Sequence, residues 1–319
     1  MENMTLWKVL VTVPVTQAQK KLLTDAGGER CIWSFLPRIK VTREILRQQD
    51  ILIGNLPPAL LAGCDNLKWV QLNSAGADLY TGEGILPPDC LLTSAVGAYG
   101  LAVSEHMLAL TFALIRRLEQ YMRNQQKHVW KSMGQIISVE ESTVLILGLG
   151  DIGSSYAVKM KALGARTIGI RRTPAKKPDF LDEQYTLEKL DEILPRADIV
   201  AMIVPENAES FHMMNAERLS LMKKGAFLIN AGRGTAVEPD ALLQALRSGH
   251  LGGAALDVTE PEPVPKDHPL WDLENLIITP HVAGQFFLPE TVNRIIRIAA
   301  DNLRAFPDEG AMRNITPHK

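Results

Sequence analysis

In the second half of the chain, from residue 142 onward, short apolar runs alternate with stretches of helical periodicity. This alternation is typical of a parallel sheet covered by helices on both faces. The expected strands are residues 143–147, 166–170, 198–204, 226–230, 254–258 and 276–279. The expected helices are residues 152–163, 187–194, 216–222 and 239–247. Together they predict an α/β, doubly wound, Rossmann-type cofactor domain.

The first hundred residues predict a separate α/β unit. Its expected strands are residues 8–13, 51–53 and 69–72, with a helical pattern at residues 41–48. Gly- and Pro-rich turns follow two of these strands, at the edge where open α/β sheets bind ligands. A long amphipathic helix is expected at residues 101–122, and a helical pattern at residues 288–306 is expected to pack back onto the first unit.

Length and composition agree with two globular domains. The chain has 319 residues, of which 46% are hydrophobic and 22% charged. The 34 Lys and Arg residues nearly balance the 36 Asp and Glu residues, leaving a formal net charge of −2. No whole-chain positive field therefore favours nucleic acid or anionic lipid, although a local basic patch stays open.

Cysteine usage and hydropathy bear on location. Cys31, Cys64 and Cys90 are odd in number and form no CxxC pair, so reduced thiols are expected and not a disulfide framework. Residues 1–8 lack the apolar core of a signal peptide, and the longest apolar run, residues 107–115, is too short to span a bilayer. A soluble, cytoplasmic protein without membrane contact is expected.

A glycine-rich turn follows the strand expected at residues 143–147. Gly148, Gly150 and Gly153 form a GxGxxG pattern that opens a helix. Glycines let backbone amides approach a pyrophosphate, and the helix amino terminus adds positive partial charge. The alternative is a purely structural turn, but the strand–turn–helix context favours dinucleotide binding.

The next strand ends in basic residues. NAD-binding sites normally carry Asp or Glu at this point, whereas a 2′-phosphate favours Arg. Here the position holds Arg171, followed by Arg172 and Thr173. We therefore expect NADP(H) to be preferred, with NAD as the alternative. These residues could instead form a solvated basic turn without a role in cofactor binding.

Three ionisable residues follow consecutive expected strands. They are Arg233, Glu262 and His281, and the carboxyl ends of those strands share one edge of the sheet. Hydride reduction of a 2-oxo acid needs a proton donor and a cation for the carboxylate and carbonyl oxygens. His281 would be the acid, Glu262 would orient it and favour its charged form, and Arg233 would bind the substrate.

The remaining histidines suggest no metal site. They show neither an HExxH motif nor clustered ligand spacing, so no metal is predicted. These residues are His106, His128, His212, His250, His268 and His318.

The order and spacing of these motifs resemble the D-isomer-specific 2-hydroxyacid dehydrogenase family, which includes glyoxylate/hydroxypyruvate reductases. The resemblance covers nearly the whole chain. It implies a cofactor domain at residues 101–284 inserted into a discontinuous, flavodoxin-like substrate domain at residues 1–100 and 285–319. It also implies reduction of a glyoxylate- or hydroxypyruvate-like 2-oxo acid to the D-2-hydroxy acid, and the reverse. Family members are commonly homodimers.

The resemblance carries over further site residues. Arg233, Glu262 and His281 match the family's catalytic positions, and the amides of Ala75 and Gly76 match those that hold the substrate carboxylate. Matches to cofactor contacts fall at Asp151, Ile152, Asn207, Ala231 and Asp257.

Some positions depart from the family pattern. Thr259 stands where many members have an aromatic residue, and Asn207 stands where Thr is common. Glu262 disfavours a formate dehydrogenase, whose pattern has Gln. A cofactor-sensing, non-catalytic protein of the corepressor type is the alternative function, because it would share these motifs without turnover.

Overall fold

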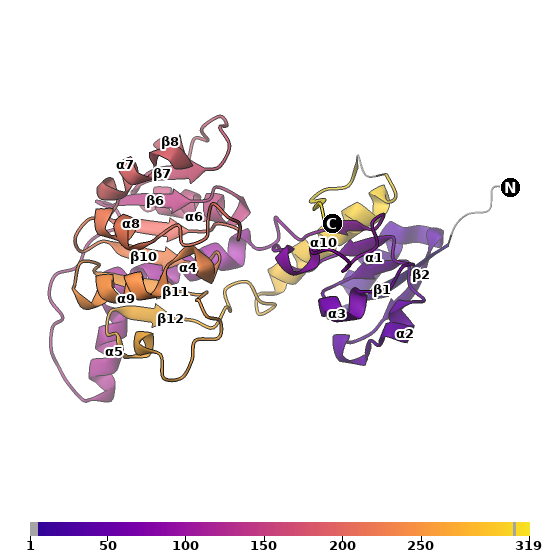
Figure 1. The fold of residues 1–319 in the computed structure, drawn as a ribbon, viewed down its shortest axis with the longest axis horizontal. Helices are drawn as coiled ribbons and strands as arrows, with labels where there is room; N and C mark the ends of the chain where they lie inside the picture. Colours follow the sequence, from indigo (N-terminus) through magenta and orange to yellow (C-terminus); the bar gives the residue numbers. More distant parts are fainter. Residues whose placement is uncertain (1–5, 309–310) are drawn as a thin grey trace. The chain divides into compact units, whose positions relative to one another are not determined.

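The computed structural model describes residues 6–308 and 311–319. Residues 1–5, which belong to the amino-terminal segment that lacks a signal-peptide core, lie outside this described part. The chain divides into two compact units (Figure 1). Unit 1 comprises Met1–Tyr99 and Phe286–Lys319, and unit 2 comprises Gly100–Gln285.

Unit 2 is built on a parallel sheet. In the described chain this sheet has seven strands in the order β12-β11-β10-β9-β6-β7-β8. The strands are β6 (Thr143–Leu147), β7 (Arg166–Arg171), β8 (Glu183–Thr186), β9 (Ile199–Met202), β10 (Phe227–Asn230), β11 (Gly253–Leu256) and β12 (Leu276–Ile278). The six expected strands are present with ends shifted by at most a few residues, and the doubly wound α/β prediction is confirmed.

Helices cover both faces of this sheet (Figure 1). They are α4 (Gly100–Ile115), α5 (Leu118–Gln126), α6 (Asp151–Ala162), α7 (Leu190–Ile193), α8 (Ala216–Leu221) and α9 (Pro239–Arg247). Side chains alternate along a strand, so Leu145 and Leu147 enter the core formed with α7, α8 and α9. Helix α4 packs against α6 and contacts β10 and β11.

Two expectations for unit 2 need correction. The single helix expected at residues 101–122 is wrong, because Arg117 adopts a left-handed conformation (φ 56°) between α4 and α5. Its Nε donates a hydrogen bond to the carbonyl oxygen of Gln135 at 2.9 Å. The helix expected at residues 187–194 is only one α-turn, α7, flanked by 3₁₀ turns.

Unit 1 is a second parallel sheet. Its described strands run in the order β2-β1-β3-β4-β5, the flavodoxin-like order. They are β1 (Trp7–Val11), β2 (Cys31–Phe35), β3 (Ile51–Ile53), β4 (Trp69–Gln71) and β5 (Leu91–Thr93). The helices are α1 (Gln17–Gly27), α2 (Arg43–Leu46), α3 (Pro58–Leu61) and α10 (Pro289–Ala305). The helix expected at residues 41–48 is therefore shorter, and β2 and β5 are additions to the predicted strands.

The returning helix α10 packs on the sheet of unit 1, as predicted. Ile296 and Leu303 share a core with Val9 and Val11 of β1. Beneath them Asn302 Nδ2 donates a 2.8 Å hydrogen bond to Gln71 Oε1, and both side chains are buried. The carboxy-terminal segment is thus tied to the first hundred residues by apolar and polar contacts.

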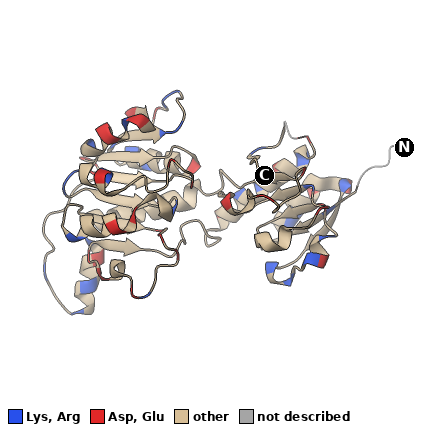
Figure 2. Ribbon diagram, viewed as in Figure 1, with Lys and Arg blue, Asp and Glu red and all other residues tan. Residues whose placement is uncertain are grey.

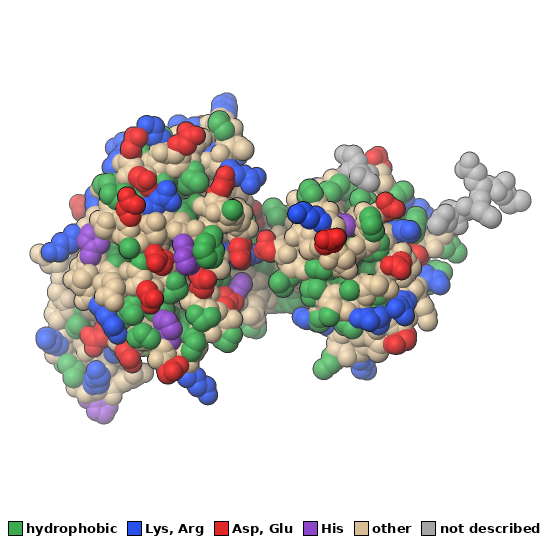
Figure 3. Space-filling view, in the orientation of Figure 1, with side chains coloured by type: hydrophobic (Ala, Val, Ile, Leu, Met, Phe, Trp, Pro, Cys, Tyr) green, Lys and Arg blue, Asp and Glu red, His purple; other side chains and the backbone are tan. Residues whose placement is uncertain are grey.

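Charges are mixed over both units (Figure 2). On the face drawn in Figure 3, positive, negative and apolar side chains are interspersed. Cys31, Cys64 and Cys90 are free thiols. In the described residues no helix is both long and apolar enough to cross a membrane, and no cluster of three His, Cys, Asp or Glu side chains is placed to hold a metal ion.

Candidate functional site

The glycine-rich turn after β6 is shaped by backbone packing at two of its three glycines. Gly148 has φ 96°, and a Cβ there would lie 2.3 Å from the carbonyl oxygen of Ile203. A Cβ on Gly153 would lie 1.9 Å from the carbonyl oxygen of Gly148. Neither position has room for a side chain, so both glycines are needed by the protein itself.

Gly150 differs, because no atom lies within 4 Å of the Cβ that another residue would place there. Its backbone is also ordinary for an L-residue, at φ −79° and ψ −161°. Helix α6 starts at the next residue, so the unpaired amides of its first turn open onto this space. The turn thus leaves room for a ligand at Gly150.

At Asp151, the first residue of α6, the side chain and the backbone amide have different roles. Asp151 Oδ2 accepts a 2.6 Å hydrogen bond from the Gly100 N–H, so its carboxylate caps the start of α4. The backbone amides of Asp151 and Ile152 remain the groups suited to an anion.

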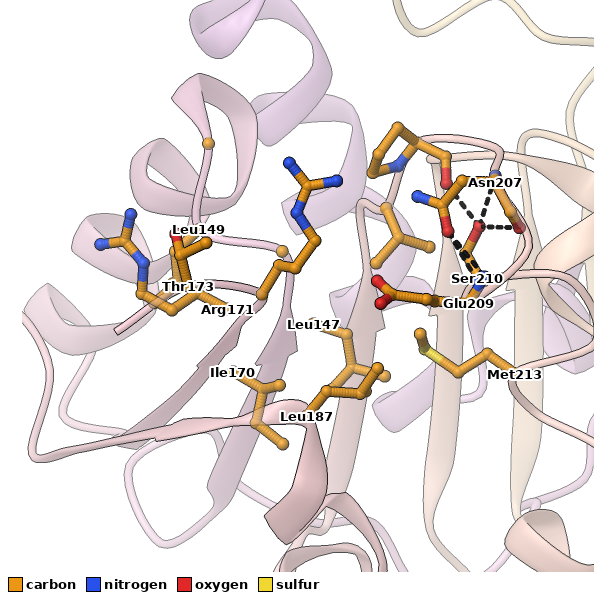
Figure 4. Close-up of a pocket in the computed structure, with 15 residues that line it drawn as sticks. Leu147, Leu149, Ile170, Arg171, Thr173, Leu187, Asn207, Glu209, Ser210 and Met213 are labelled. Carbon is orange, nitrogen blue, oxygen red and sulfur yellow. Dashed lines mark hydrogen bonds between the residues drawn. The ribbon is translucent and has the colours of Figure 1, made fainter. Parts of the chain in front are cut away.

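A cavity of about 310 Å³ adjoins this turn (Figure 4). Apolar side chains such as Leu149, Ile170 and Leu187 line part of it. Figure 4 shows Arg171 and Thr173 on one side of the cavity, and Asn207, Glu209, Ser210 and Met213 on the other. Such an apolar cavity with a few polar groups at its rim suits a flat heterocycle and its attached groups.

The predicted cations lie at the cavity. Arg171 ends β7, Arg172 follows it, and both line the cavity with Thr173. The Nε atom of Arg171 is buried and has no hydrogen-bond partner among the described residues. A buried guanidinium donor with no partner is costly, and a phosphate oxygen would satisfy it.

Asn207 serves a local turn. Its Oδ1 accepts hydrogen bonds from the backbone N–H groups of Glu209 (2.9 Å) and Ser210 (3.0 Å). Ser210 Oγ in turn accepts from the Asn207 N–H at 2.9 Å. Sequence reasoning did not single out Glu209 and Ser210, because neither belongs to a spaced motif.

The Arg233 loop is held by the side chain that ends β10. Asn230 Oδ1 accepts from the Gly232 N–H at 3.0 Å, and Asn230 Nδ2 donates to the Arg233 carbonyl oxygen at 2.9 Å. The N–H of Ala231 donates to Met202 in the neighbouring strand β9. These bonds fix the backbone that carries the Arg233 guanidinium.

The structure brings His281 and Glu262 together. His281 Nδ1 lies 2.7 Å from Glu262 Oε1, with the two side chains 51% and 44% exposed. The other ring nitrogen, Nε2, makes no hydrogen bond to a described residue. A carboxylate that binds Nδ1–H orients the ring and leaves Nε2 to exchange a proton with a ligand.

Asp257, just after β11, holds the turn that carries His281. Its side chain is 3% exposed. Oδ1 accepts from the Thr279 hydroxyl (2.6 Å) and the Val282 N–H (3.0 Å), and Oδ2 accepts from the Ala283 N–H (3.1 Å). Its carbonyl oxygen accepts from the His281 N–H at 2.8 Å. The carboxylate that the sequence predicts to face the cofactor thus organises the turn that carries His281.

Two histidines outside the predicted site bond to side chains that are near predicted residues in sequence. His106 Nε2 lies 3.0 Å from Thr279 Oγ1, and His212 Nε2 lies 2.7 Å from Glu260 Oε2. His106 is 173 residues from Thr279 in sequence, and no spacing rule connects them.

The turn predicted to hold a carboxylate lies in unit 1. Ser74 Oγ donates to the Gly76 carbonyl oxygen at 2.6 Å, and Asn55 Nδ2 donates to Ser74 Oγ at 3.0 Å. The backbone N–H groups of Ala75 and Gly76 donate no hydrogen bond to any described residue. A pre-shaped turn with unused amide donors is suited to an anion.

Comparison with known proteins gives a consistent result. Residues 108–283 match the model of the NAD binding domain of the D-isomer specific 2-hydroxyacid dehydrogenases. A glyoxylate reductase of Korarchaeum cryptofilum is 33% identical over 85% of this chain and 83% of its own length.

Solved structures agree with this. A D-isomer specific 2-hydroxyacid dehydrogenase family protein of Aeromonas salmonicida is 31% identical, with a TM-score of 0.85 over 98% of this chain and 99% of that one. A D-isomer specific 2-hydroxyacid dehydrogenase of Xanthobacter autotrophicus, crystallised with NADPH and MES, is 28% identical, with a TM-score of 0.81 over 98% of each chain.

Proposed function

Because the chain belongs to the D-isomer specific 2-hydroxyacid dehydrogenase family of NAD(P)-dependent oxidoreductases, we propose that it reduces a small 2-oxo acid to the D-2-hydroxy acid with His281 as the acid/base. Glyoxylate and hydroxypyruvate are the substrates we favour. The relative named glyoxylate reductase supports that choice. The observation that carries the proposal is the 2.7 Å contact between His281 Nδ1 and Glu262 Oε1.

The residues of unit 2 divide the work in this proposal. A bound reduced nicotinamide supplies the hydride. His281 Nε2–H delivers a proton to the developing alkoxide, while Glu262 holds the ring and stabilises its positive charge. Arg233 binds the substrate's carboxylate and carbonyl oxygens and polarises the carbonyl group. In the reverse direction neutral His281 accepts the hydroxyl proton.

In unit 1, the free amides of Ala75 and Gly76 are our proposed donors to the substrate carboxylate. The Ser74 and Asn55 hydrogen bonds shape this turn before any ligand is present. Pre-organised donors lower the entropic cost of binding a small anion.

The cofactor residues fit a dinucleotide. Gly148 and Gly153 shape the turn, Gly150 leaves open space beside the first turn of α6, and we assign the backbone amides of Asp151 and Ile152 to the pyrophosphate. We assign the cavity beside them to the adenosine portion. Asn207, Ala231 and Asp257 complete the proposed cofactor contacts.

We further propose a preference for NADPH over NADH. Its support is the buried, unpartnered Arg171 Nε together with Arg172 and Thr173 at the cavity rim. A 2′-phosphate there accepts charge-assisted hydrogen bonds that NADH cannot offer.

Self-association as a homodimer is a separate proposal. Along α5 and the segment after it, apolar side chains are exposed, including Met122 (64%) and Trp130 (104%). Burying them between two copies of the chain removes apolar area from water. Light scattering coupled to gel filtration tests this, because a mass of one chain at micromolar concentration would contradict it.

The experiment that tests the function follows nicotinamide absorbance while purified protein is mixed with NADPH or NADH and a series of 2-oxo acids. The series runs from glyoxylate through hydroxypyruvate to phenylpyruvate. We expect oxidation of NADPH with the small acids, and a weaker response with NADH. Cofactor binding without turnover across the series would contradict the proposed reaction.

A further inference from the structure

We propose that His106, on α4, is a positioning residue for His281, acting through Thr279 and Asp257. This inference rests on the proposed role of His281 as the acid/base. His106 does not contact His281 in this scheme. It fixes one end of a hydrogen-bond chain whose other end is the backbone of the catalytic turn.

The number of available protons determines which group donates in each hydrogen bond from His106 through Thr279 to Asp257. The Thr279 hydroxyl donates to Asp257 Oδ1 at 2.6 Å. A hydroxyl has a single proton, so Thr279 Oγ1 can only accept from His106 Nε2, which lies 3.0 Å away. His106 is therefore protonated at Nε2. That same N–H lies 3.6 Å from Asp257 Oδ1, close enough to add favourable electrostatics to a nearly buried carboxylate.

At the other end of this hydrogen-bond chain, Asp257 accepts hydrogen bonds from three consecutive backbone N–H groups. Asp257 accepts the N–H of His281 on its carbonyl oxygen, and the N–H groups of Val282 and Ala283 on its carboxylate. His281 itself has φ 51°, a left-handed conformation that a non-glycine residue keeps only when its surroundings hold it. A shift of the Asp257 carboxylate therefore moves the backbone from which the His281 ring projects.

Other hydrogen bonds anchor α4, so His106 is not needed to hold this helix in place. The first residue of this helix, Gly100, donates its N–H to Asp151 Oδ2 at 2.6 Å. Thr111 Oγ1, one turn from the helix end, bonds the hydroxyl of buried Tyr156 on α6 at 2.7 Å. With both ends of α4 held to α6, loss of the His106 bond acts on the catalytic turn and not on the helix.

The kinetic test compares His106→Leu with His106→Gln. The Gln side chain offers an N–H donor near the position of Nε2, whereas Leu offers none. We expect His106→Leu to lower kcat by roughly 10- to 100-fold, the scale of a small displacement of a catalytic group. KM and the Kd for NADPH should change by about twofold or less, and His106→Gln should recover most of kcat. Glu105→Gln, at the exposed neighbour on the same helix, is the matched control.

A second measurement does not depend on activity. Hydrogen exchange of peptides that cover residues 279–285 reports on the three amides held by Asp257. We expect faster exchange in His106→Leu and in Thr279→Val, with near wild-type protection in His106→Gln and Thr279→Ser. Thr279→Val cuts the same chain at its middle, so it also serves if His106→Leu does not fold.

The double variant provides the decisive comparison. If both residues act through one chain, His106→Leu with Thr279→Val loses no more kcat than the worse single variant. A kcat loss in the double variant equal to the product of the two single losses would overturn the inference. An unchanged kcat in His106→Leu, or unchanged exchange at residues 279–285, would also overturn it. His281→Ala is measured in parallel, because retained turnover in that variant would instead refute the proposed function.

Discussion

Glu262 Oε1 lies 2.7 Å from His281 Nδ1, and a second pair of the same kind, Glu260 Oε2 and His212 Nε2, also lies at 2.7 Å. The two pairs differ in which ring nitrogen the carboxylate occupies. In His281 the occupied atom is Nδ1, so the outer nitrogen, Nε2, is left for a ligand. In His212 the outer nitrogen is itself occupied, and the ring stacks on Phe211 with centroids 4.1 Å apart.

This difference predicts unequal effects of removing the two imidazoles. His281→Ala should lower turnover by roughly 100-fold or more, because the reaction loses its proton donor, while the Kd for NADPH stays nearly unchanged. His212→Ala is the control and should keep turnover within a few fold. Steady-state kinetics with a 2-oxo acid and fluorescence titration of NADPH measure both effects. A small kinetic loss in His281→Ala would remove His281 from the mechanism.

Sequence patterns predicted the parts of this fold that burial dictates. Strands such as β6 and β10 consist mostly of apolar residues. Residues that follow the parallel strands share one edge of the sheet, which is why Arg233, after β10, and His281, after β12, could be selected. Strand β8, Glu-Gln-Tyr-Thr, is an edge strand of intermediate burial and carries no such signal.

Other features depend on contacts between distant residues. The break at Arg117 falls within an uninterrupted helical pattern and is stabilised by a bond to the Gln135 carbonyl. The chain from His106 through Thr279 to Asp257 joins α4 to two loops that only the tertiary fold brings together. Periodicity and motif spacing describe neither, because both methods compare residues along the chain.

The basic rim of the cavity predicts a cofactor-specific loss. Replacing Arg171 and Arg172 with Ala should weaken NADPH binding by roughly 100-fold, about 3 kcal/mol, if each makes a charge-assisted bond to the 2′-phosphate. NADH lacks that phosphate and should lose only a few fold. Titration of each cofactor into the double variant measures the ratio.

Lys176→Ala is the matched control for the loss of positive charge. Lys176 is exposed and is not among the residues that line the cavity. Its replacement should leave the ratio of NADPH to NADH affinity unchanged. Equal losses of affinity for NADPH and NADH in the arginine variant would show that these arginines do not bind the 2′-phosphate.

Two alanine substitutions in the glycine turn should have different effects: Gly150→Ala should weaken cofactor binding, and Gly148→Ala should lower stability. Gly150→Ala meets no protein atom within 4 Å, so the melting temperature should stay near wild type while cofactor Kd rises at least tenfold, because the methyl group occupies ligand space. Gly148→Ala places a Cβ 2.3 Å from the Ile203 carbonyl oxygen and should destabilise unit 2. Thermal unfolding and cofactor titration separate the two effects. Unchanged affinity in Gly150→Ala would contradict the assigned phosphate site.

Strand β8 is held by an ion-pair network, and that network predicts a pH-dependent stability. Hydrogen bonds from Arg196, then Tyr185 and Arg166, lower the pKa of Glu183 from its ordinary 4.5 to about 2. Arg166 lies 2.6 Å from Glu183 Oε1, and the Tyr185 hydroxyl donates to Oε2 at 2.5 Å. These partners favour the ionised carboxylate in the folded state, and Glu183 itself is only 19% exposed.

Since the folded pKa lies below the unfolded one, this stabilisation is present in full above about pH 4.5 and is lost as the pH falls toward 2. Glu183→Gln should therefore lower the free energy of unfolding by about 1 kcal/mol at pH 7, because the network is partly exposed and screened. Urea unfolding at a series of pH values should show the difference from wild type shrinking between pH 4.5 and 2. Glu188→Gln, at an exposed position nearby, should show little difference at any pH. A wild-type advantage that stays constant down to pH 2 would mean that shape, and not charge, holds β8 to β7.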